Sequence, residues 1–60
     1  MKRIFFQYRW YEIARGESWH YIDVDLNSCL NAMWGFARRH DWRFSFTITS
    51  TSSVIIHRVR

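Results

Sequence analysis

Apolar and polar residues alternate along the first third of the chain. From residue 4 to residue 13, one set of alternate positions holds Ile4, Phe6, Tyr8 and Trp10, while the other set includes Gln7 and Arg9; residues 19–24 alternate again. A period of two with many aromatic residues is typical of β-strands. Residues 15–18 separate the two stretches and include Gly16, a residue type common in tight turns. The pattern therefore predicts two strands joined as an antiparallel hairpin.

A helical pattern follows the second strand. Between residues 26 and 40 the apolar residues recur at spacings of three and four, which places them on one stripe of an α-helix. Asp25 can cap the start of this helix. Arg38, Arg39 and His40 would occupy its last turn, where cations complement the negative end of the helix dipole. The predicted stripe consists of Leu26, Cys29, Leu30, Met33, Phe36 and Ala37.

Two further β-rich segments end the chain. Residues 44–49 alternate between large apolar and hydroxyl side chains, which predicts a strand with one apolar face. Residues 54–59 form the other segment, with either Val54 and Ile56 or Ile55 and Val59 facing inward.

The element order predicts a single α+β domain over residues 1–60. Its antiparallel sheet would have the order β-β-α-β-β, with one amphipathic helix packed on one face. The residues expected to meet the helix stripe as core are Ile4, Phe6, Tyr8, Trp10, Ile22, Val24, Phe44, Phe46 and Ile48.

The opposite face of this sheet would expose aromatic rings interleaved with arginines. Twelve of the 60 residues are aromatic, and a chain of this size buries only about 60 % of its unfolded surface. Trp, Tyr and Arg are the residues that most often carry binding energy at interfaces. We therefore expect a partner-binding surface there, unless some of these rings fold over to complete a thin core. The expected residues are Arg9, Tyr11, Trp19, Tyr21 and Arg43, with Phe5 on the same face and Arg38 and Arg39 on the helix as a second patch.

The charge of the chain favours negatively charged partners. Its formal net charge is +4, carried by eight arginines and one lysine. Basic domains are attracted to nucleic acid and to acidic protein surfaces, although this charge also lies within the range that keeps small proteins soluble. Three hypotheses follow: binding to a host protein or protein–nucleic-acid complex, binding of single-stranded nucleic acid on the open sheet face, and self-association as a homodimer.

The sequence gives no sign of catalysis, of a metal site or of a cofactor. The three histidines and Cys29 are scattered, without the spacing of metal ligands. The two glycines form no phosphate-binding loop. Asp23 and Asp25 precede the helix, where capping explains them better than paired acid–base work. We therefore expect a protein that is not an enzyme.

The single cysteine also bears on location. One cysteine cannot form an internal disulfide, which favours a reducing cytoplasm. The basic start is followed by alternation instead of the apolar run of an export signal. Apolar runs long enough to span a membrane do not occur, so no membrane partner is expected.

The layout of a hairpin, an amphipathic helix and the closing strand Ile55-Ile56-His57-Arg58-Val59-Arg60 resembles very short phage-encoded inhibitors of host machinery. These include anti-CRISPR proteins and the small phage inhibitor of bacterial RNA polymerase. The resemblance implies a non-enzymatic blocker that occupies a functional surface of a larger assembly in the host cytoplasm. Because no motif position matches, it transfers no functional residue. The basic charge departs from the acidic members of this group, which mimic DNA.

Overall fold

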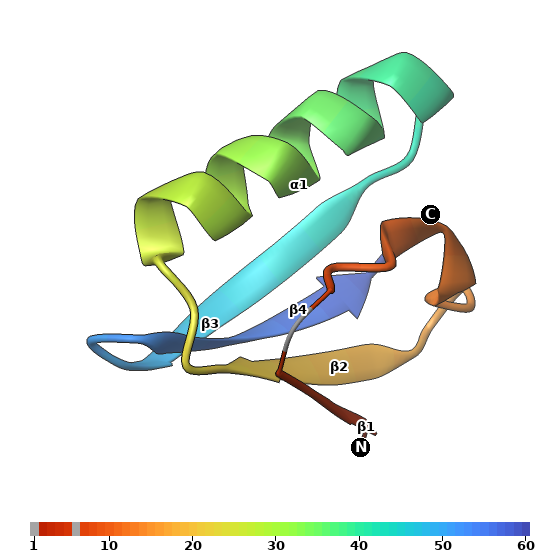
Figure 1. Cartoon of the computed structure of the whole chain (residues 1–60). Coiled ribbons are helices and arrows are strands. Elements are labelled where there is room, and N and C mark those ends of the chain that lie inside the picture. Colours follow the sequence, from red (N-terminus) through yellow and green to blue (C-terminus); the bar gives the residue numbers. More distant parts are fainter. Residues whose placement is uncertain (1, 6) are drawn as a thin grey trace.

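The computed structural model describes residues 2–5 and 7–60, and shows a four-stranded sheet with a helix across one face (Figure 1). The strand order in the sheet is β1-β2-β4-β3. The predicted α+β class and β-β-α-β-β order are confirmed. The elements are β1 (Lys2–Ile4), the short 3₁₀ helix η1 (Trp10–Glu12), β2 (Ser18–Ile22), α1 (Leu26–His40), β3 (Phe44–Ser50) and β4 (Ser53–Arg58).

The first two strands are parallel, so the predicted hairpin is wrong. β1 is only three residues long, and its register sets Lys2 beside Trp19 and Ile4 beside Tyr21. Parallel neighbours need a crossover of about a dozen residues, and residues 5–17 provide it. The other two pairings, β2 with β4 and β4 with β3, are antiparallel, the orientation predicted for the sheet. The sheet is therefore mixed.

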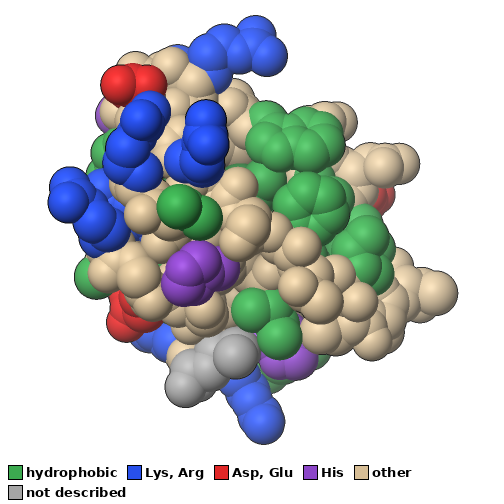
Figure 2. Space-filling view, turned by 180° about the vertical axis from the view of Figure 1, so that it is seen from behind, with side chains coloured by type: hydrophobic (Ala, Val, Ile, Leu, Met, Phe, Trp, Pro, Cys, Tyr) green, Lys and Arg blue, Asp and Glu red, His purple; other side chains and the backbone are tan. Residues whose placement is uncertain are grey.

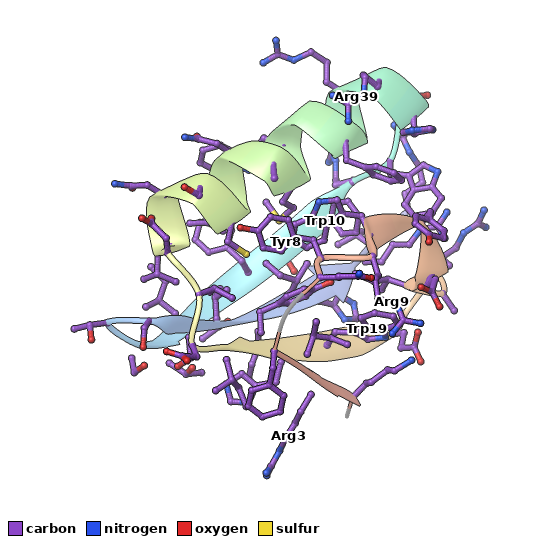
Figure 3. All side chains as sticks on the ribbon, viewed as in Figure 1. Arg3, Tyr8, Arg9, Trp10, Trp19 and Arg39 are labelled. Carbon is purple, nitrogen blue, oxygen red and sulfur yellow. The ribbon has the colours of Figure 1, made fainter. Side chains whose placement is uncertain are left out.

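The crossover passes over the helix-side face of β2 instead of extending β1. Tyr8 and Trp10 lie between α1 and the sheet (Figure 3), with their ring centroids 5.0 Å apart. The Trp10 ring centroid lies 4.9 Å from that of Tyr21, whose hydroxyl donates to the Tyr8 carbonyl. Ile13 is fully buried. The alternation thus identified Ile4 and Trp10 correctly as buried, while the backbone that carries Trp10 is not a strand; Phe6, also expected in the core, lies outside the described residues.

The facing of β2 is the reverse of the prediction. Trp19 is 2 % exposed and Tyr21 is fully buried, whereas Ile22 is half-buried on the other face. The register explains this, because Tyr21 is level with Ile4 on one side and Val54 on the other. Shifting a strand's facing by one residue exchanges every side chain between the two faces. Val24, beyond the strand, is partly buried against the core.

The register also decides the facing of the last two strands. Ile56 is level with both Trp19 and Phe46, and Val54 and Ile56 are fully buried, so the first of the two alternatives for this segment holds. Phe46 and Ile48 face the same side but remain 40 % and 53 % exposed. Their expected place in the core is wrong because β3 is the edge strand, with a neighbour on one side only. Phe44 is partly buried against the core.

Helix α1 has the predicted bounds. The Asp25 side chain caps its start by accepting a hydrogen bond from the Ser28 amide (3.2 Å). Cys29, Met33 and Phe36 are its buried residues, and they pack on the sheet through the predicted stripe. Asp41 ends the helix in the left-handed conformation (φ 55°). None of the helices among the described residues is long and apolar enough to cross a membrane.

Candidate functional site

The structure divides the residues of the predicted binding surface among three places. Trp19 and Tyr21 are core residues, so their expected exposure on the open face is wrong. The physical reason is the parallel pairing of β1 and β2, which turns both rings toward the crossover segment. Burial raises the pKa of the Tyr21 hydroxyl well above its usual range. These two rings pack in the core and cannot contact a partner.

Arg9 and Tyr11 lie at the short helix η1, away from the open sheet face. Tyr11 is the most exposed large ring of the described residues, at 70 %. The guanidinium of Arg9 is held by the Glu12 carboxylate through two contacts, the longer of which is 2.9 Å. Hydrogen bonding to Arg9 lowers the pKa of Glu12 below its usual value. Arg9 therefore brings little uncompensated charge to a partner.

Arg43 lies beside the second predicted patch, because α1 ends just before β3 begins. Arg38 and Arg39 occupy the last turn of α1, and Arg39 is labelled at that end in Figure 3. Arg43 and Arg60 exchange two backbone hydrogen bonds of 3.0 and 3.1 Å, which brings the chain's last residues to the same place. The Gly16 amide donates to the Arg58 carbonyl (2.8 Å), which brings the neighbouring Arg15 close to the end of β4. We call this group the arginine end: Arg15, Arg38, Arg39, Arg43, Arg58 and Arg60.

Arg58 is the structural member of the arginine end. Its guanidinium lies over the Trp42 ring, 3.3 Å from the centroid, and its Nη1 donates to the Ile13 carbonyl (3.0 Å). This contact fixes the crossover segment to the end of β4. It also covers one face of Trp42, an aromatic ring of this surface.

The positive charge of the arginine end is only partly compensated. Asp41 and Arg60 form an exposed ion pair with an N–O distance of 3.0 Å. Within the part of the chain that the structure describes, the other five arginines form no ion pair. Asp23 and Asp25 lie near the opposite end of α1. Glu17 lies at the arginine end as well, because its carbonyl accepts from the Arg58 amide. In the view from behind, most Lys and Arg side chains lie on one flank, with acidic side chains among them (Figure 2).

Among the described residues, the open face of the sheet carries hydroxyl and imidazole side chains in place of the Trp19 and Tyr21 rings predicted there. Ser18 Oγ and His57 Nδ1 are 2.7 Å apart, and His20 Nε2 lies 3.0 Å from Thr49 Oγ1. Arg3 points away from the core on this side of the sheet (Figure 3). This face does not carry the row of rings and guanidinium groups that the sequence predicted there. Stacking of nucleic-acid bases requires exposed aromatic faces, and among the described residues the two large rings predicted for this role, Trp19 and Tyr21, are buried in the core.

An exposed apolar surface lies elsewhere, where α1 meets the outer edge of β3. Trp34 is 50 % exposed and packs edge-to-face on Phe46, with ring centroids 6.1 Å apart. Ile48 continues the surface along β3. We call Trp34, Phe46 and Ile48 the apolar edge patch. The sequence analysis assigned Phe46 and Ile48 to the core, and only their position on an edge strand distinguishes them from core residues.

The arrangement of the described side chains does not favour a metal site or a reactive cysteine. Across residues 2–5 and 7–60, no three His, Cys, Asp or Glu side chains are grouped to hold a metal ion. Cys29 is fully buried, and burial raises the pKa of its thiol to about 11. A thiol in this state is a poor nucleophile at neutral pH, because the thiolate is the reactive form.

The fold and these surfaces define a small α+β domain with a basic end and a separate apolar edge. Comparisons with protein-family models, with curated proteins and with solved structures find no match.

Proposed function

We propose that this protein is a non-enzymatic binding protein that occupies an acidic surface of a larger protein through its arginine end. The observation that supports the proposal is the gathering of six arginines from four parts of the chain at one end of the fold. The short inhibitors that the layout resembles act in this way, by covering a functional surface of a host protein.

The choice of residue type favours a partner that offers carboxylates. Arginine presents a planar fork that binds a carboxylate through two parallel hydrogen bonds, which lysine cannot do. Arg9 binds the Glu12 carboxylate in this way within the chain itself, through its Nε and its Nη2. Among the described residues, no carboxylate pairs with Arg38, Arg39 or Arg43. Each of these guanidinium groups can therefore donate to a carboxylate of another protein.

Phosphates also fit arginine forks, and nucleic acid is the alternative partner. Proteins that bind single strands combine cations with free ring faces. At the arginine end, Arg58 already lies on Trp42, and the Trp19 and Tyr21 rings predicted for the open sheet face are buried in the core. These features favour a protein over a single strand.

A charge-matched pair of variants tests the proposal. Arg38→Gln/Arg39→Gln removes two charges from the arginine end, and Arg3→Gln/Arg9→Gln removes two from elsewhere. Each tagged variant is used to capture partners from a bacterial lysate treated with nuclease, and the affinity for the captured protein is then measured. We expect the first variant to bind at least about 30-fold more weakly, since interface hot-spot residues contribute about 2 kcal/mol or more.

Two outcomes would contradict the proposal. Equal binding by the two double variants would show that the arginine end is not the docking surface. Loss of all captured material after nuclease treatment would favour nucleic acid, and the affinity for a single-stranded oligonucleotide should then fall steeply with salt as counterions are released.

A further inference from the structure

Strand β3 has an unusual composition for the edge of a sheet. Its seven residues, Phe44–Ser50, include no charged residue and no proline, and all but Phe44 are exposed. Natural proteins usually protect an edge with charges, proline or a very short strand, because an open edge pairs with other strands. The opposite edge is protected in this way, since β1 has three residues and two of them are Lys2 and Arg3.

The hydrogen-bonding groups on the outer edge of β3 can be assigned from the register. The Arg58 amide donates to the Glu17 carbonyl, and the Arg58 carbonyl accepts from the Gly16 amide. Both groups of Arg58 therefore point toward the β2 side and away from β3. Phe44 is level with Arg58, and opposed residues of an antiparallel pair either bond each other or both point away. Phe44 therefore directs its own groups outward. Because this direction alternates along a strand, Phe46 and Ile48 do the same.

The apolar edge patch lies directly beside these outward groups. Phe46 and Ile48 belong to both features, and Trp34 extends the apolar surface onto α1. In the view from behind, apolar side chains gather on the flank opposite the Lys and Arg side chains (Figure 2). A strand that pairs with β3 would therefore gain backbone hydrogen bonds and apolar contacts together.

We infer that the occupant of this edge is a second copy of the chain, paired antiparallel through β3 about a two-fold axis at Phe46. Around that centre Phe44 lies opposite Ile48 and Ser45 lies opposite Thr47, so apolar residues meet apolar residues and hydroxyls meet hydroxyls. A two-fold interface uses the same surface on both copies, and an uncharged strand can do so without setting like charges opposite each other. The pairing would join two sheets into one of eight strands.

The irregular register of β3 favours a two-fold axis at Phe46 over one at Thr47. The register of β3 with β4 shifts between Ile48 and Ser50, so the regular part of the strand is residues 44–48. A two-fold axis at Phe46 uses all five of these residues. An axis at Thr47 would set Phe44 opposite the irregular end and lose its hydrogen bonds.

This inference is independent of the proposed function, because it concerns a different surface. Sedimentation equilibrium across a range of concentrations measures it directly. We expect the unmodified protein to approach twice the 7.5 kDa mass of one chain. A mass of one chain at every concentration would overturn the inference. It would not affect the function proposed for the arginine end.

Substitutions on the open face of β3 test the geometry. Ser45→Lys/Thr47→Lys sets two pairs of lysines directly opposite each other in the dimer, and we expect it to weaken dimerisation at least tenfold. Ser45→Gln/Thr47→Gln matches the size of these side chains without the charge and should remain dimeric. A dimer that tolerates the lysines would overturn the pairing through β3.

Cross-linking provides a second readout if the lysine variant fails to fold. Opposed residues that do not bond each other have Cα atoms about 4.5 Å apart, within the range of a disulfide. Ser45→Cys/Thr47→Cys should therefore form a covalent dimer under mild oxidation, linked between positions 45 and 47. Failure to form this dimer, or links between other positions, would overturn the inferred register.

Discussion

The guanidinium of Arg58 and the indole ring of Trp42 are stacked, with 3.3 Å between the guanidinium carbon and the ring centroid. Trp42 in turn packs edge-to-face on Phe36 of α1, with centroids 5.1 Å apart. Since Arg58 also donates to Ile13, this single side chain connects the crossover segment, the last strand and the end of the helix. The arginine end is thus anchored to the core through one of its own members.

Replacement of Arg58 should reduce stability even when the new residue is a cation of similar length. Lysine keeps the charge but lacks the planar group that stacks on Trp42 and reaches the Ile13 carbonyl. We expect Arg58→Lys to lower the free energy of unfolding by about 1–2 kcal/mol, measured by urea denaturation. The matched control is Arg43→Lys, an exposed position for which we expect a change below about 0.5 kcal/mol. Equal effects at both positions would show that the stacked contact adds nothing.

Truncation of either buried ring of β2 should abolish folding rather than weaken binding selectively. A large aromatic residue replaced by Ala in a core costs about 3–5 kcal/mol, and a domain of this size has about 3–5 kcal/mol in total. We therefore expect Trp19→Ala and Tyr21→Ala to lose the near-ultraviolet circular dichroism of the native protein.

Tyr21→Phe is the milder test of the same region. It removes only the hydroxyl that donates to the Tyr8 carbonyl, and should cost about 1–2 kcal/mol while the protein stays folded. A folded Trp19→Ala variant with native dichroism would contradict the burial of that ring.

The Cys29 thiol should be protected from reaction in the native protein. Burial raises its pKa to about 11 from an ordinary 9.0, so thiolate is scarce at pH 8 and the sulfur is inaccessible. If reaction requires unfolding, a stability of about 3 kcal/mol slows labelling by a disulfide reagent about 100-fold relative to the urea-unfolded chain. Equal rates in both states would contradict this burial.

The same shift predicts a loss of stability in alkaline solution. The unfolded thiol ionises above pH 9 while the folded thiol remains neutral until about pH 11, so the contribution is intact below pH 9 and is lost across that interval. Burial raises the pKa of Tyr8 and Tyr21 as well, which extends the loss to higher pH. In melting curves, Cys29→Ala should show a shallower decline between pH 9 and 11 than the unmodified protein. Identical slopes would mean that Cys29 is not the group responsible.

Asp41→Gly should stabilise the fold. Asp41 adopts φ 55° after the last helical residue, a conformation that glycine occupies at lower cost. The ion pair with Arg60 that is lost is exposed and contributes little. We expect a gain of about 0.5–1 kcal/mol in urea denaturation. The variant also makes the arginine end more positive, so it should bind an acidic partner more tightly; weaker binding would contradict the role proposed for that end.

Only part of the candidate arginine surface could be predicted from the sequence. Arg38 and Arg39 follow from the helical period, whereas Arg43 was assigned to the open sheet face and lies beside them because α1 ends just before β3 begins. Arg58 and Arg60 could not be added, because they come close to Arg43 only when β4 pairs with β3. The apolar edge patch was missed because alternation gives the side on which Phe46 and Ile48 lie, and not whether another strand or helix covers them.

The sequence by itself determined the elements that depend on near neighbours in the chain. The helix over residues 26–40, its cap at Asp25, and the alternation of residues 44–48 all follow from local spacing and local hydrogen bonding. The tertiary structure alone decided the parallel pairing of β1 with β2 and the burial of Trp19 and Tyr21. Those depend on contacts between residues distant in the chain, and a register change of one residue reverses the facing of an entire strand.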